Sequence, residues 1–280
     1  MVPRRTVAVL LTLLLGFAVW GDDPPSKDAK DAKDAAEQKE RLEFMKRQAA
    51  EYEVTLKSSP PVKLVLHGEP LLRFSNAVGD VTDGIAVMWK EGERPAIFAQ
   101  IFLLKNGLWV HECQSMASAG LSMRLGKVTR WEPEDAALKF TPLPDAPRAA
   151  DTALKRLVQM KAQADRFSAT DDFKSSTDGE ATRYELRLLP KPVYRYQDAK
   201  GGINDGAVFA FVHGTDPELF LILEHQGEGD KAGWFYALVP MTCWAVQARL
   251  GKTEVWSVPE RLNKTTPRGP YHVWTHRPDK

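Results

Sequence analysis

The charged residues that recur at equivalent places in the two halves of the chain are the first candidates for chemistry. Asp83 and Asp205 each precede a glycine, and Arg73 and Arg195 each lie shortly before them. Two carboxylates could share general acid–base work if folding brought them together, but an aspartate before glycine commonly bonds its own turn backbone. An arginine on a strand could bind an anionic ligand or pair with the nearby aspartate. We expect turn and ion-pair roles, and we retain these four as candidate binding residues.

Tryptophan and histidine give weaker signals. Trp109 and Trp234 are equivalent in the two halves and could line a carbohydrate or peptide groove, although aromatic residues at repeated positions more often belong to a core. We add both to the candidate binding residues. A metal site needs three or four converging ligands, and none of the six histidines is matched by a histidine in the other half. The sequence therefore predicts neither a metal site nor a cofactor.

A hydrolase hypothesis rests on three residues of the first half, His111, Glu112 and Ser115. Adjacent residues of a strand face opposite sides, so His111 and Glu112 would not converge on one substrate. The sequence also lacks a Gly-x-Ser-x-Gly elbow, a phosphate-binding glycine loop and a Cys-x-x-Cys pair. We therefore predict no catalytic residues and keep the hydrolase as the alternative function.

An internal repeat explains why these residues recur. Three blocks of sequence return in the same order at offsets of 115, 122 and 125 positions, and the length changes fall in loop-like sequence. The paired blocks are 41–52 with 156–167, 64–98 with 186–220, and 109–142 with 234–267. Self-similarity of this kind predicts two copies of one structural unit.

Each copy is predicted to hold one helix followed by about six antiparallel strands. Leu42, Met45 and Ala49 have the spacing of a helix that packs on a core. Residues 85–89 are apolar at both odd and even positions, which predicts a hairpin that is covered on both faces. The Asp-Gly pairs and the Leu-Gly-Lys steps predict tight turns. We expect an α+β fold, a tandem duplication in which each N-terminal helix packs on an antiparallel sheet. A cystatin-like curled sheet is the first choice and a split barrel the second.

The length of 280 residues accommodates two domains of ordinary size. The predicted organisation is a signal peptide (1–21), a disordered polar segment (22–38), repeat copy 1 (39–132), a Pro-rich linker (133–150), repeat copy 2 (151–267) and a tail (268–280).

The leader predicts export to the periplasm or the extracellular space. Arg4 and Arg5 precede an apolar run from Val7 to Trp20, and Val19 and Gly21 place small residues where a signal peptidase needs them. The run is short for a membrane span of roughly twenty residues, so we expect no stable span after cleavage. The alternative is a chain anchored by an uncleaved leader.

Charge and cysteine content limit the partners and the covalent chemistry. A formal net charge of +1 without a basic face makes nucleic acid a poor partner. Cys113 and Cys243 are the two cysteines of the chain. They could form one disulfide in an oxidising compartment or remain two small buried thiols, and we favour the thiols. The sequence leaves the oligomeric state open.

Several motifs of the first copy resemble a pattern in exported proteins of planctomycete bacteria that have no assigned activity. The pattern runs through 72–76 (Leu-Arg-Phe-Ser-Asn), 83–89 (Asp-Gly-Ile-Ala-Val-Met-Trp), Gly92, Arg94-Pro95 and 111–115 (His-Glu-Cys-Gln-Ser). The resemblance covers about a third of the chain, because the second copy keeps its Asp-Gly pair but lacks the His-Glu and Ser. It implies export and no assigned reaction.

These observations favour an exported, non-enzymatic module of two repeats, a binding or structural protein. Its partner, an unknown protein or a small ligand, is expected at the seam between the copies. The doubly covered hairpins and the absence of catalytic groups shared by both copies support this expectation.

Overall fold

The computed structural model describes residues 27–134, 138–174, 179–262 and 264–277. Strands hold 52% of the structure and helices 14%, and the described residues contain two α-helices, so the protein is mostly β. The expected α+β class is therefore wrong, and the cystatin-like and split-barrel pictures that depended on it are dropped. Both predicted helices form, but the many apolar strands pair into a curled half-barrel sheet instead of tandem helix-on-sheet copies.

The strands follow one another with short connections in both halves. The first half contains α1 (Lys27–Ala50), β1 (Tyr52–Leu56), β2 (Val62–Lys63), β3 (Val65–Leu66), β4 (Leu72–Asn76), β5 (Val81–Glu91), β6 (Arg94–Leu104), β7 (Trp109–Ser115), β8 (Leu121–Leu125) and β9 (Val128–Trp131). The connecting segment contains β10 (Thr141–Pro142). The second half contains α2 (Ala153–Ala164), β11 (Phe167–Lys174), β12 (Ala181–Leu188), β13 (Tyr194–Asp198), β14 (Ile203–His213), β15 (Asp216–Gln226), the 3-10 helix η1 (Gly229–Lys231), β16 (Gly233–Pro240), β17 (Ala245–Leu250) and β18 (Thr253–Val258), and the tail forms β19 (Tyr271–His276).

Strand pairing follows the same scheme in the two halves. The second half forms one sheet in the order β10-β16-β15-β14-β12-β11-β17-β18, with β13 on β14. The first half forms two sheets, β2-β1-β8-β9 and β19-β7-β6-β5-β3, with β4 on β5. Strand β12 bridges β11 and β14, whereas the first half divides this role between β2 on β1 and β3 on β5. The predicted domain boundaries stay a prediction.

The two long hairpins, β5–β6 and β14–β15, form the centre of each half. Their turns use Gly92 and Gly214, which take positive φ values of 63° and 64° that glycine adopts without strain. The Leu-Gly-Lys turns predicted at Gly126 and Gly251 also form, with φ values of 57° and 58°.

The predicted turns at the Asp-Gly pairs do not form. Gly84 lies inside β5 and Gly206 inside β14. A Cβ on Gly84 would come within 2.6 Å of the Phe74 ring, and one on Gly206 within 2.6 Å of the Tyr196 ring. Glycine is needed here because an aromatic ring from the neighbouring strand covers the backbone.

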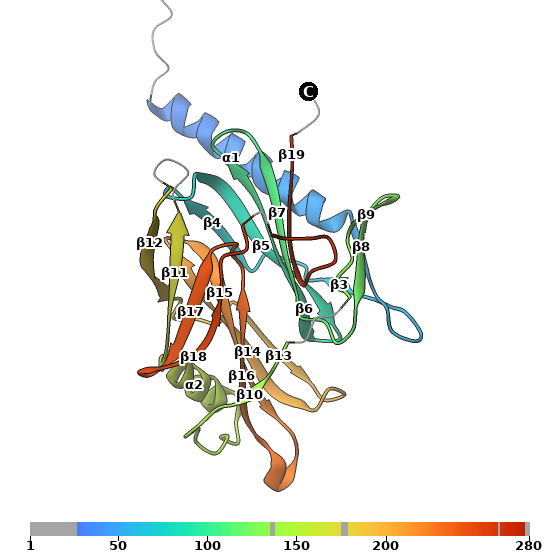
Figure 1. Ribbon diagram of the computed structural model, residues 1–280, viewed down its shortest axis with the longest axis vertical. Helices are drawn as coiled ribbons and strands as arrows, with labels where there is room; N and C mark the ends of the chain where they lie inside the picture. Colours follow the sequence, from blue (N-terminus) through green and yellow to red (C-terminus); the bar gives the residue numbers. More distant parts are fainter. Residues whose placement is uncertain (1–26, 135–137, 175–178, 263, 278–280) are drawn as a thin grey trace, which may run out of the picture. The chain divides into compact units, whose positions relative to one another are not determined.

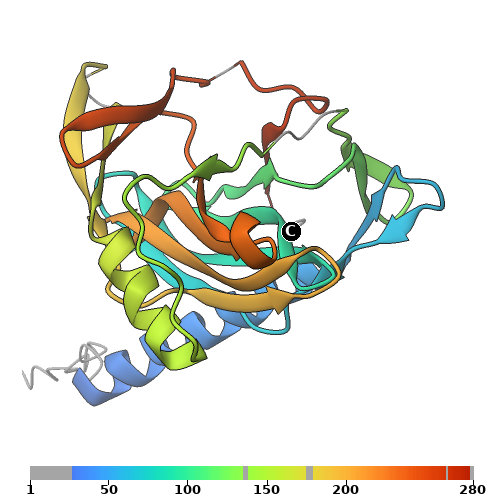
Figure 2. The ribbon, with the colours of Figure 1, turned by 90° about the horizontal axis from the view of Figure 1, so that it is seen from below.

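Three apolar cores hold the structure together. The first lies within the first half and includes Met45, Trp89 and Trp131. The second lies within the second half, where α2 packs on β14 and β15 (Figure 2). The third joins the halves, and the repeat-equivalent Phe98 and Phe220 meet there with ring centroids 4.3 Å apart. The long hairpins are therefore buried on both faces, as their apolar runs predict.

Each half receives an edge strand from the segment that follows the other half. Strand β10, which follows the first half, pairs with β16, and β19, which follows the second half, pairs with β7 (Figure 1). The indole Nε1 of Trp131 also donates to the carbonyl of Gly269 in the tail, at 2.8 Å. Strand β10 within the predicted linker and strand β19 within the predicted tail are thus parts of the sheets.

Several predictions concern the N-terminal residues and the cysteines. The predicted signal peptide lies outside the described residues, and α1 begins at Lys27, inside the segment predicted to be disordered. Neither helix in the described part of the chain combines the length and apolar composition that a membrane crossing requires. Cys113 and Cys243 are free thiols, and burial raises the pKa of both.

Candidate functional site at the junction of the two halves

The arginines and aspartates singled out by the sequence form internal ion pairs. Arg73 donates to the Asp83 carboxylate from Nε at 2.9 Å and from Nη2 at 2.7 Å. Arg41 of α1 donates to the same carboxylate at 3.1 Å. Asp83 is buried, so two guanidinium groups compensate one carboxylate.

The second half repeats this arrangement. Asp205 is fully buried and accepts from Arg195 at 3.0 and 2.7 Å and from Arg156 of α2 at 2.8 Å. In each half one arginine also bonds a helix carbonyl, Arg73 to that of Gln38 and Arg195 to that of Ala153. These groups connect a helix to the sheet.

The candidate tryptophans lie apart from each other. Trp109 belongs to the core of the first half, against Phe44 at 4.5 Å between ring centroids. Trp234 belongs to the core of the second half, against His225 at 5.2 Å. The structure therefore does not gather the six candidate binding residues into one site.

The residues of the hydrolase hypothesis are separated as well. His111 is buried in the core of the first half, where its Nδ1 lies 3.0 Å from the Tyr52 hydroxyl and its ring stacks on Trp274. Burial lowers the pKa of His111 to about 3. Ser115 Oγ accepts from the backbone of Ala117, and no hydrogen bond among the described residues joins it to His111 or Glu112. The nucleophile–base contact of a serine hydrolase is not formed.

Glu112 belongs to a buried polar group on the opposite side of β7. Its carboxyl accepts a hydrogen bond from the Tyr271 hydroxyl of β19. Burial raises the pKa of Glu112 to about 7, and the nearby Arg261 opposes the rise. The guanidinium of Arg261 stacks over the Tyr271 ring, with 3.6 Å from Cζ to the ring centroid.

A cavity of about 680 Å³ adjoins this polar group. It lies between the halves and is lined by both of them, by the connecting segment and by the segment leading to the tail. Its lining residues are Gln114, Ser115, Met116, Leu138, Lys139, Thr141, Tyr236, Ala237, Leu238, Val239, Pro240, Val255, Trp256, Val258, Arg261 and Pro270. A concave space of this size with mainly apolar walls and a few polar groups is typical of small-molecule sites.

Arg261 is the charged group most firmly held in the cavity wall. Its Nη1 lies 3.3 Å from the Gln114 side-chain oxygen, and its Nη2 donates to the Thr242 carbonyl at 2.7 Å. Its Nε is buried and has no hydrogen-bond partner. Burial lowers the pKa of Arg261, but a guanidinium remains charged in proteins. The cavity wall therefore carries a fixed positive charge, which could attract an anion.

The chain was compared with protein-family models, with curated proteins and with solved structures. No family model, no curated protein and no solved structure matches this chain.

The sequence did not point to the residues that line the cavity. Arg261 has no arginine counterpart in the first copy, where the equivalent residue is Ala136. Gln114 and Arg261 are 147 positions apart in the sequence, so no local pattern predicts their contact. A search for charged residues that have an uncharged counterpart in the other copy would have identified Arg261.

Proposed function

We propose that the protein is an exported, non-enzymatic module that binds a small ligand with an apolar body and a negatively charged group in the junction cavity. The observation that carries this proposal is Arg261, a buried cation in the cavity wall whose Nε has no hydrogen-bond partner. The negatively charged group of a ligand in the cavity would form a charge-assisted pair with this guanidinium.

The remaining walls define the rest of the ligand. Met116, Leu238 and Trp256 offer apolar surface, and Lys139 adds a second positive charge. An apolar body would displace water from these walls, and an acid group would pair with Arg261. A carboxylate or sulfonate attached to a ring or an alkyl chain has both properties.

The binding test uses 8-anilinonaphthalene-1-sulfonate as an anionic probe and N-phenyl-1-naphthylamine as its neutral analogue. We expect saturable binding of one anionic probe per folded chain, and weaker binding of the neutral probe. The variant Arg261→Gln should weaken the anionic probe at least tenfold, about 1.4 kcal/mol. Leu238→Trp, which fills the cavity, should weaken both probes.

The controls separate loss of binding from loss of fold. Arg268→Gln changes an exposed arginine that pairs with Glu134, and it should bind as wild type does. Lys139→Gln removes a cavity charge without disturbing the hydrogen bonds of Arg261 and should weaken only the anionic probe. Equal affinity of wild type and Arg261→Gln for the anion, with thermal melts showing both folded, would contradict the proposal.

Export is the second part of the proposal and rests on the leader sequence. Expression of the full chain in a bacterium should yield a periplasmic or secreted protein whose first residue is Asp22. A chain that stays with the membrane fraction and keeps its leader would favour the anchored alternative.

A further inference from the structure

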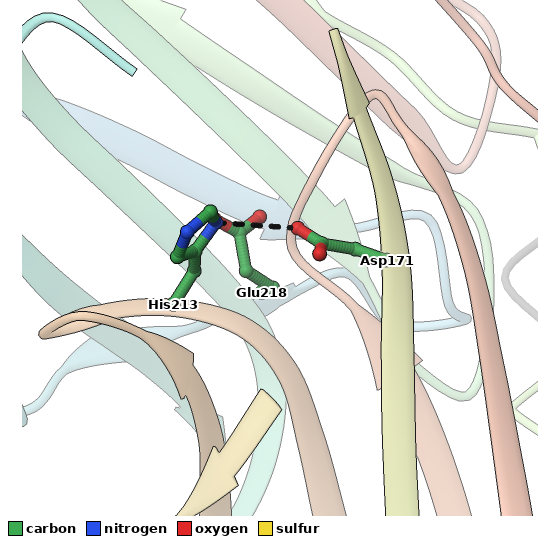
Figure 3. Close-up of side chains that lie close together, drawn as sticks. All are labelled: Asp171, His213 and Glu218. Carbon is green, nitrogen blue, oxygen red and sulfur yellow. Dashed lines mark ion pairs between the residues drawn. The ribbon is translucent and has the colours of Figure 1, made fainter. Parts of the chain in front are cut away.

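We infer that the second half contains a binding site for a divalent transition-metal ion, with Zn²⁺ as the first choice, formed by Asp171, His213 and Glu218. This site goes beyond the proposed function, because none of the three residues lines the junction cavity. Each residue offers one ligand atom, and these atoms all lie within 4.8 Å of one another. Figure 3 shows the three side chains pointing toward one another from β11, β14 and β15.

Asp171 supplies the observation that distinguishes this site from an ordinary acidic cluster. Its side chain is fully buried, and neither carboxylate oxygen has a hydrogen-bond partner. The Nδ1 of His213 lies 3.7 Å from Oδ2, and this nitrogen also lacks a hydrogen-bond partner. A buried carboxylate without partners is costly, and a metal ion is one of the few groups that compensates it.

The surroundings lack the positive charge that would otherwise balance these acids. Asp216 and Glu218 are also buried, and Asp216 Oδ1 has no hydrogen-bond partner. Among the described residues, no lysine or arginine forms an ion pair with Asp171, Asp216 or Glu218. A divalent cation would supply the missing charge at the point where the ligand atoms converge.

The first half shows that the fold does not require acids at these places. The repeat offsets place Leu56 at the position of Asp171, and Ala96 at the position of Glu218. The strand register agrees, because Leu56 pairs with Leu121 as Asp171 pairs with Val246. Both Leu56 and Ala96 belong to the apolar core of the first half. The two acids therefore replace apolar residues at positions that the sheet can fill without charge.

The donor set selects the class of ion. One imidazole nitrogen and two carboxylate oxygens suit Zn²⁺ and Mn²⁺ better than Ca²⁺ or Mg²⁺, which prefer oxygen alone. A tetrahedral zinc ion with bonds near 2.1 Å separates its ligands by about 3.4 Å, which small side-chain rotations would reach from the observed spacing. Rings of Phe173 and Tyr184 pack around His213, at 5.8 and 4.4 Å between ring centroids, and limit access of water.

The test measures metal content and metal affinity of the untagged full chain. After treatment with a chelator and addition of equimolar Zn²⁺, Mn²⁺, Ca²⁺ and Mg²⁺, mass spectrometry of the desalted protein should find one transition-metal ion per chain. Titration calorimetry with Zn²⁺ should give one site, and Co²⁺ should give the absorption bands of a low-symmetry site. The variants Asp171→Asn, His213→Gln and Glu218→Gln should each weaken Zn²⁺ binding at least about 100-fold.

Two controls and one substitution taken from the repeat keep the test decisive. The first control, Asp172→Asn, changes the next residue of β11, which pairs with Arg183. The second control, His225→Gln, changes a histidine of β15 that lies outside the site. Both variants should bind Zn²⁺ as the wild-type protein does. Asp171→Leu installs the residue of the first half and should fold without binding Zn²⁺. Absence of a stoichiometric ion in wild type, or wild-type affinity in the three ligand variants, would overturn the proposal.

Discussion

Asp83 and Asp205 show how a buried charge is used as a structural connection. Each carboxylate accepts from two arginines, one on the helix and one on the short strand that precedes the long hairpin. Because both carboxylates are buried, removal of their charge would leave two guanidinium groups without a counter-ion.

The substitution Asp205→Asn tests this role. We expect it to lower the free energy of unfolding by about 3 kcal/mol, since it breaks a buried pair. Asp172→Asn is the matched control, because its partner Arg183 is exposed and water screens a surface pair, so we expect a much smaller loss. Urea titration of both variants gives the two values, and equal losses would mean that the Asp205 pair is not structural.

His111 should make the stability of the protein depend on pH. Its folded pKa of about 3 lies below the ordinary value of 6.5, because burial disfavours the charged form. The unfolded chain therefore binds more protons between these values, and stability falls as pH drops from 6.5 towards 3. The slope contributed by this residue reaches about 1.4 kcal/mol per pH unit.

The variant His111→Gln isolates this contribution. Urea titrations of wild type and variant from pH 7.5 to pH 4 should converge on acidification, because the variant lacks the titrating group but can still bond the Tyr52 hydroxyl. Curves that stay parallel over the whole range would assign the acid sensitivity to other groups.

At the scale of elements, β19 contacts both faces of its neighbour β7. It pairs with β7 over six residues, and its Trp274 stacks on His111 while its Tyr271 bonds Glu112. Removal of β19 would expose both faces of β7 at once, together with a row of unpaired backbone groups.

A chain that ends at Gly269 tests this dependence. We expect loss of cooperative unfolding or a fall in melting temperature of 10 °C or more, on the order of several kcal/mol for lost apolar burial. A chain that ends at Arg277 keeps β19 and serves as the control. An unchanged melting temperature in the shorter chain would show that the exchanged strand adds nothing to stability.

The sequence predicted some elements well because their signals are local. The apolar run at 85–89 correctly predicted a hairpin buried on both faces, and the Leu-Gly-Lys steps at Gly126 and Gly251 correctly predicted turns. The Asp-Gly turns failed because Gly84 and Gly206 accommodate an aromatic ring instead of a chain reversal. The fold class failed because two helical stripes were given the weight of a whole layer in a protein with many more strands.

The candidate sites were less accessible to sequence reasoning, because they depend on contacts between distant segments. Arg261 reaches Gln114 across 147 positions, and no local pattern encodes that contact. Asp171 did carry a signal, since it lies between the inward-facing Ala169 and Phe173 on an alternating strand. In this chain, an acidic residue among the inward-facing apolar residues of a strand indicates a candidate site better than an acidic residue that both copies share.

At the scale of the whole molecule, the contact between Phe98 and Phe220 connects the two halves. Their rings lie 4.3 Å apart in the core that the halves share, and each ring is fully buried. Aromatic pairs of this kind contribute about 0.5–1.5 kcal/mol beyond the area they bury.

A double-mutant cycle with Phe98→Leu and Phe220→Leu measures this coupling. Each single variant should lose at least about 1 kcal/mol of unfolding free energy, and the double variant should lose less than their sum by about 0.5–1.5 kcal/mol. The control cycle combines Phe98→Leu with Phe209→Leu, which lies in the core of the second half, and should be additive within about 0.5 kcal/mol. Additivity in both cycles would mean that the halves are not energetically coupled through this pair.

The exchange of β10 and β19 bears on how such a chain could have arisen. A gene encoding one copy would yield a polypeptide whose final segment extends away from its own sheet, leaving an edge bare. Two such polypeptides would each need the other to complete a sheet, as the two halves of this chain do. Joining the two genes would then have turned an encounter between molecules into an event within one molecule, independent of protein concentration.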